Sequence, residues 1–131
     1  MRPINSFHIV QATGADAAAG EVLRFGDRLI GPVPARVVEA QFALGDGGYL
    51  VFATLDSPFE EELTILCLDP DFRERDRVAI GAPYTPGLLQ AVTQTGPAQL
   101  SFRFARPDRW LLDVAPRRSW AGLGVKWLHL A

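Results

Sequence analysis

The segment AQLSFRFA, residues 98–105, alternates between apolar and polar side chains. The apolar side chains that an extended chain would place on one face are Leu100, Phe102 and Phe104. The polar side chains that would then share the opposite face are Gln99, Ser101 and Arg103. A period of two is typical of a β-strand with one face in a core and the other in water. The segment therefore predicts such a strand.

Similar short segments lie on both sides of it and are separated by Gly, Pro and Asp turns. The expected strands are Phe7–Gln11, Glu21–Phe25, Arg28–Ile30, Tyr49–Leu55, Glu62–Leu68, Arg77–Ile80, Leu88–Thr93, Ala98–Ala105, Trp110–Val114 and Val125–Leu130. Turns about every eight to twelve residues predict an all-β protein. We expect one domain over residues 1–131, an antiparallel meander that forms a sandwich or an open barrel. Tyr49–Leu55 and Glu62–Leu68 are apolar on both faces, which predicts a central position.

Two segments carry sequence signals that are typical of a helix. A short helical turn is expected near residues 15–19, after a capping-box pattern and before Gly20. Ala35–Leu44 fits a helix by its flanking Pro34 and Gly45, and fits a strand by its alternation. We favour the strand for Ala35–Leu44.

Composition excludes several classes of protein. Of the 131 residues, 48% are hydrophobic and 21% charged, which excludes a disordered chain, a coiled coil and a collagen-like repeat. The net charge of -2 predicts neither a nucleic acid nor a membrane as partner. Arginine outnumbers lysine by 12 to one, which favours a bacterial source. The N-terminal residues lack the apolar core of a signal peptide, so we expect a cytoplasmic protein.

The reactive side chains form no recognisable catalytic motif. His8 and His129 lie near opposite ends of the chain, and no serine lies in a nucleophile elbow. The single cysteine, Cys67, lies among apolar neighbours and is expected in the core. We therefore predict no catalytic residue, no cofactor and no metal ion.

Clusters of carboxylates support the main alternative to a protein without catalytic or metal-binding residues. One cluster comprises Asp56, Glu60, Glu61 and Glu62, and a second comprises Asp69, Asp71, Glu74 and Asp76. Such clusters can bind calcium or serve acid–base chemistry, which leaves open a carboxylate-based enzyme or a sugar-processing module. Arginines interleave with the second cluster, so we favour solvated hairpin ends with ion pairs.

The charges and the tryptophans are unevenly distributed. Residues 57–80 carry a balance of -4, whereas residues 81–131 carry +4. The three tryptophans, Trp110, Trp120 and Trp127, all lie in the basic part. Aromatic rings interleaved with arginine can stack on single-stranded bases. The arginines are few and the whole chain is acidic, so we favour the core for Trp110 and a closing role at one end of the sheet for the other two.

In an antiparallel meander the connections gather at two opposite rims. One rim would collect residues 56–61, 81–86 and 106–109, where aromatic rings lie beside prolines and mixed charges. The residues that we predict to bind a partner there are Asp56, Phe59, Glu60, Glu61, Tyr84, Arg106 and Arg109. Phe59 fits equally well as a plug at the end of the core.

These features predict a small bacterial protein-binding module that acts by occluding its partner. An immunity protein that neutralises a toxin is its most concrete form, because it needs a rigid scaffold and a charged, aromatic rim but no catalytic residue. The acids of the rim favour a basic target surface. Besides the enzyme, the second alternative is a structural subunit that self-associates through an edge strand.

Overall fold

The computed structural model describes residues 1–12, 14, 20–55, 61–81, 87–118 and 124–131. Within these residues the chain forms β-strands and no helix, which confirms the all-β prediction. The helical turn expected near residues 15–19 lies outside the described residues. No helix able to cross a membrane occurs in the described part of the chain.

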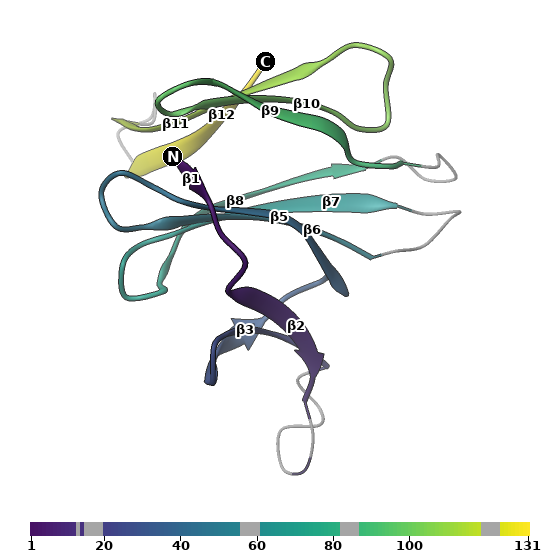
Figure 1. The fold of residues 1–131 in the computed structure, drawn as a ribbon, viewed down its shortest axis with the longest axis vertical. Helices are drawn as coiled ribbons and strands as arrows, with labels where there is room; N and C mark the ends of the chain where they lie inside the picture. Colours follow the sequence, from purple (N-terminus) through teal and green to yellow (C-terminus); the bar gives the residue numbers. More distant parts are fainter. Residues whose placement is uncertain (13, 15–19, 56–60, 82–86, 119–123) are drawn as a thin grey trace.

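The strands form three antiparallel sheets, which Figure 1 shows stacked as layers. The central sheet contains, in spatial order, β1 (Arg2–Pro3), β5 (Val37–Ala43), β6 (Tyr49–Thr54), β7 (Glu62–Leu68) and β8 (Glu74–Gly81). The C-terminal sheet contains β12 (Val125–Leu130), β11 (Trp110–Arg118), β10 (Gln99–Arg103) and β9 (Gln90–Gly96). The N-terminal sheet contains β2 (Phe7–Gln11), β3 (Glu21–Phe25) and β4 (Arg28–Pro32).

The larger part of the core lies between the central and C-terminal sheets. Its fully buried members from the central sheet are Leu50, Phe52, Leu63, Ile65 and Cys67. Those from the C-terminal sheet and its hairpin are Leu100, Phe102, Phe104, Leu112 and Leu128. The apolar face expected for residues 98–105 is thereby confirmed, whereas Ser101 on the opposite face is buried. No sheet closes into a barrel among the described residues, so a sandwich is formed.

The opposite face of the central sheet is covered by the N-terminal sheet, a third layer that the sequence did not predict. Val51, Leu66 and Leu68 of the central sheet pack there against Phe7 and Leu23. The central strands β6 and β7 are therefore buried on both faces, as their apolar sequences predict.

Gln41 attaches the third layer to the central sheet. Its side-chain Oε1 accepts hydrogen bonds from the backbone N–H groups of Ser6 and Phe7, at 2.8 and 2.7 Å. Its Nε2 donates to the carbonyl oxygen of Phe7 at 3.1 Å. Gln41 lies in β5, so the strand interpretation of Ala35–Leu44 is also confirmed.

Some strand limits differ from the expected ones. β8 begins at Glu74 rather than Arg77, and β11 continues to Arg118 through residues expected in a turn. Pro116 cannot donate a ladder hydrogen bond, and the register between β11 and β12 shifts between Val114 and Arg117 to form a bulge there. Bulges of this kind have no periodic signature, which is why the sequence missed the extension.

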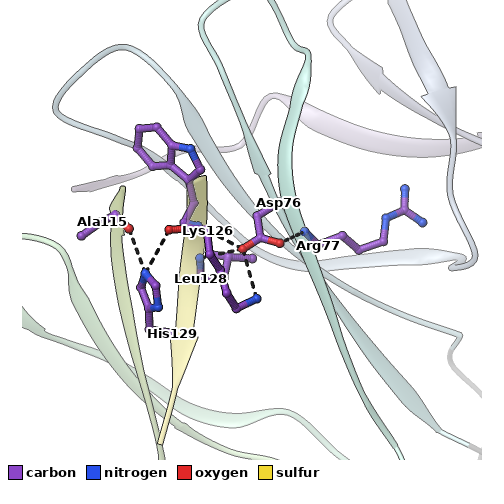
Figure 2. A network of polar contacts seen from close by, with 7 residues as sticks. Asp76, Arg77, Ala115, Lys126, Leu128 and His129 are labelled. Atoms are coloured by element: carbon purple, nitrogen blue, oxygen red, sulfur yellow. Dashed lines mark hydrogen bonds and ion pairs between the residues drawn. The ribbon is translucent and has the colours of Figure 1, made fainter. Parts of the chain in front are cut away.

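Asp76 joins the neighbouring edges of the two large sheets (Figure 2). Its Oδ2 accepts hydrogen bonds from the backbone N–H groups of Trp127 and Leu128 at 3.1 and 2.9 Å, and lies 3.4 Å from the Lys126 ammonium. Its Oδ1 accepts from the Arg77 N–H at 2.8 Å. Burial alone would raise the pKa of Asp76, but the three N–H groups and Lys126 together lower it below its ordinary value. The carboxylate therefore closes this side of the sandwich.

Candidate functional site

A groove of about 450 Å³ lies at one end of the C-terminal sheet. Figure 1 shows that the β10–β11 connection and the start of β9 lie at the same end of the molecule as the end of β6. The groove is lined by residues from these two segments of the C-terminal sheet: Leu88, Gln90, Arg103, Phe104, Ala105, Arg106 and Pro107. It is thus placed at the rim where the sequence predicts a binding surface.

The backbone on both sides of the groove adopts conformations that the surrounding structure must enforce. Ala105 and Ala91 have φ angles of 58° and 54°, a region that L-residues other than glycine seldom occupy. A Cβ atom at Gly87 would lie 2.6 Å from the ring of Phe104, so only glycine lets the chain pass over that ring. Strained backbone costs on the order of 1–3 kcal/mol per residue and tends to occur at functional sites.

Arg106 is fixed although it is exposed to solvent. Its guanidinium carbon lies 3.5 Å from the centre of the Trp110 ring. Its Nη2 donates long hydrogen bonds to the carbonyl oxygens of Arg109 and Ala131, at 3.3 and 3.4 Å. The Trp110 indole N–H donates to the Phe104 carbonyl oxygen at 3.0 Å, which holds the ring in place. The stack presents the planar guanidinium in one orientation.

Arg109 supports the same end of the sheet from the outer face. Its Nε and Nη2 donate to the Ser101 hydroxyl oxygen at 3.1 and 2.7 Å, and Nη2 also donates to the Ala91 carbonyl oxygen at 2.7 Å. These bonds link the β10–β11 connection to β9 and β10. They also explain why Ser101, which was expected to face water, is only 5% exposed.

The groove carries positive charge and one prominent apolar side chain. Arg103 pairs with Gln90 through the β-ladder, but its side chain is exposed and makes no hydrogen bond or ion pair with another described residue. None of the ion pairs between described residues involves Arg103, Arg106 or Arg109. Leu88 is 68% exposed, more than any other large apolar side chain that the structure describes as exposed. The groove therefore combines an accessible aliphatic surface with guanidinium groups that form no ion pair with a described residue.

No protein-family model, curated protein or solved structure matches this chain.

The structure describes three of the seven residues predicted to bind a partner. Arg106 lines the groove and Arg109 lies behind it. Glu61 is 8% exposed, and its Oε1 accepts a hydrogen bond from the Leu55 N–H at 2.8 Å, so this carboxylate makes a structural contact within the chain. The remaining four, Asp56, Phe59, Glu60 and Tyr84, lie outside the described residues.

Leu88, Gln90 and Arg103 were not predicted as site residues. The sequence predicts Leu88 and Arg103 only as parts of strands, and the structure places Leu88 just before β9. Arginine recurs every third residue at Arg103, Arg106 and Arg109, across a strand end and a turn. This spacing was the available signal, since a turn brings such residues to one end of a sheet.

Several described acids of the two clusters make structural contacts. So does Asp46, which lies outside both clusters: it accepts from the Gly48 N–H at 2.9 Å and lies 2.8 Å from Nη1 of Arg75. Asp69 accepts from two backbone N–H groups of its own turn, and Glu74 pairs with Arg77 at 2.7 Å. No group of three histidine, cysteine or acidic residues able to hold a metal ion occurs among the described residues.

His129 and Cys67 both have structural roles. Nε2 of His129 lies 3.0 Å from the Ala115 carbonyl oxygen and 3.1 Å from that of Lys126, as Figure 2 shows, so Nε2 carries the proton and donates to them. Cys67 is fully buried, as predicted. Burial raises the pKa of its thiol to about 11, although the charge of Arg75 partly opposes this. A thiol with this pKa is a poor nucleophile at neutral pH.

Proposed function

We propose that the chain is a small bacterial protein-binding module that acts by occluding its partner through the rim that carries the groove. An immunity protein that neutralises a toxin in the cytoplasm is the form of this function that we favour. The observation that carries the proposal is Leu88, 68% exposed in the lining of a groove of about 450 Å³ where the Arg106 guanidinium is held against the Trp110 ring.

A rigid site of this kind favours binding. Association costs free energy when side chains lose freedom, and Arg106 and Arg109 have already lost much of theirs in the free protein. Arginine is enriched in interaction hot spots, so Arg106 suits such a site, and Leu88 adds exposed apolar area that a partner can bury. The strained backbone at Ala105 and Ala91 is likewise maintained where it shapes the groove.

The alternative of assembly through an edge strand has less support. β8 and β12 are joined through Asp76, and β1 covers part of the outer edge of β5. Two register shifts interrupt the pairing of β9 with β10. Bulges and covered edges are the features by which β-proteins avoid pairing with further strands.

Replacing Leu88 tests the proposal. Because Leu88 is largely exposed, Leu88→Asp should fold normally, yet it should weaken partner binding by about 2 kcal/mol. Leu29→Asp is the matched control, since Leu29 is 56% exposed in β4 of the N-terminal sheet. We expect a stoichiometric partner to co-purify from the native cell with the wild type and Leu29→Asp but not with Leu88→Asp. Equal recovery with all three proteins would exclude this rim.

The two aromatic residues predicted at the same rim need a separate test. If Phe59 and Tyr84 are contacts, Phe59→Ala and Tyr84→Ala should each weaken binding by about 1–3 kcal/mol while the melting temperature stays unchanged. If they are core plugs, the melting temperature should fall instead. Variants that melt early but bind normally when folded would remove these rings from the binding surface.

A further inference from the structure

The described lining of the groove carries positive charge. It contains Arg103 and Arg106 and no described acidic residue, although the chain as a whole carries a net charge of -2. Asp108 lies in the same connection but does not line the groove and pairs with no arginine among the described residues. The positive charge is therefore local and uncompensated by described groups.

We propose that this groove binds an acidic, aliphatic segment of the partner polypeptide. A carboxylate of that segment accepts hydrogen bonds from Arg103 and Arg106, and a neighbouring aliphatic side chain packs against Leu88. The inference rests on the proposed function, since it names the chemistry of the partner at the same rim. It departs from the basic target surface expected from the acids of this rim, because the described lining is basic, Glu61 is buried, and Asp56 and Glu60 lie outside the described residues.

The guanidinium of Arg106 is arranged for a carboxylate. Its described hydrogen bonds use Nη2 only, so Nε and Nη1 keep their N–H groups available at the edge of the stacked plane. Both parallel pairs of N–H groups in a guanidinium include Nη2, so Nε and Nη1 each offer one separate bond to a carboxylate oxygen, and such a charge-assisted bond is about twice as strong as a neutral one. Because the Trp110 ring fixes the plane, little freedom is lost when the carboxylate binds.

A polypeptide fits this groove better than a nucleic acid does. Base recognition by a basic surface relies on accessible aromatic faces. One face of Trp110 is covered by Arg106, and the ring stacks on the other side with Phe102, at a centroid distance of 6.5 Å and an interplanar angle of 16°. Trp127 is covered by Arg75 at 4.0 Å. Leu88 offers aliphatic contact, which a polypeptide can return and a phosphate backbone cannot.

Nuclear magnetic resonance with defined peptides tests the inference. The probes are a blocked tetrapeptide that alternates aspartate and leucine, the same peptide with lysine in place of aspartate, and an oligothymidylate. The acidic peptide should shift the Leu88 methyl signals, the Arg106 side-chain N–H signals and the Trp110 indole signal. The lysine peptide should leave these signals unshifted. Added salt should weaken the binding of the acidic peptide.

Charge reversal supplies the second measurement. Arg103→Glu removes an exposed side chain without described partners, so the fold should persist and affinity for the acidic peptide should fall by about tenfold or more. Arg73→Glu makes the same charge change at the opposite rim and should leave the affinity unchanged. Equal shifts from both peptides, no shift from either, or tighter binding of the oligothymidylate would each overturn the inference.

The two experiments distinguish a failure of this inference from a failure of the proposed function. A partner that is lost with Leu88→Asp but retained with Arg103→Glu would support occlusion and refute the acidic segment. Specific binding of the acidic peptide without any co-purifying partner would support the chemistry of the groove and refute the proposed function.

Discussion

At the scale of single residues, Gly48 illustrates how closely the chain packs behind the β5–β6 turn. A Cβ atom there would lie 2.5 Å from the Leu68 carbonyl oxygen and 2.7 Å from Nη1 of Arg75. The carbonyl belongs to the β-ladder and cannot withdraw, so Gly48→Ala should lower the free energy of unfolding by about 1–3 kcal/mol. A Cβ at Gly45 in the same turn would meet nothing within 4 Å. In urea unfolding, the free energy of unfolding of Gly45→Ala should lie within about 0.5 kcal/mol of the wild-type value. An equal loss of stability in both variants would refute the steric argument.

Cys67 allows a chemical test of the core at the same scale. With its pKa raised from 9.0 to about 11, the thiol should be about a hundredfold less ionised than a free one near neutral pH. Burial also blocks access, so a disulfide reagent should label it slowly in the native protein and rapidly in denaturant. Cys67→Val provides the unlabelled baseline. Rapid native labelling would show that the two sheets open far more often than their packing implies.

At the scale of elements, Asp76 connects β8 to β12 and makes stability depend on pH. Because the folded-state pKa lies below the ordinary value of 3.8, this stabilisation is present above that value and is lost as pH falls through the folded pKa. Asp76→Asn should lower the free energy of unfolding at pH 7 by about 1–3 kcal/mol, since an amide cannot accept from all three N–H groups. It should also flatten the acid limb of the stability profile. Asp71→Asn, at an exposed acid in the β7–β8 turn, should leave the loss of stability at low pH unchanged. If both variants reduce that loss, it comes from the overall charge of the protein and not from Asp76.

The sequence predicts the elements better than their arrangement. The ends of Phe7–Gln11 and Glu62–Leu68 were predicted to the residue, because local alternation and turn residues define them. The third layer was missed, because its attachment depends on hydrogen bonds between Gln41 and Phe7, 34 residues apart, which leave no local pattern. The rim of the site was predicted from connection order, but the groove arises from how Leu88 meets the Arg103–Pro107 segment in space.

At the scale of the whole molecule, three stacked layers imply unequal stability. β6 and β7 are covered on both faces, whereas the N-terminal sheet covers one face of the central sheet and depends strongly on Gln41. Backbone amides of Phe52 and Ile65 should therefore exchange with solvent only through global unfolding. Those of Ile9 and Leu23 should exchange through a local opening that requires less free energy.

Gln41→Ala leaves the buried Phe7 N–H and carbonyl unpaired. It should accelerate exchange in β2 and β3 by about tenfold or more, since such groups cost about 1–3 kcal/mol, and should change β7 far less. Native-state hydrogen exchange measures both sheets in one experiment. If all four amides report the same opening free energy in the wild type, and Gln41→Ala lowers it equally for all of them, the three layers unfold as one cooperative unit and the N-terminal sheet is integral to the sandwich.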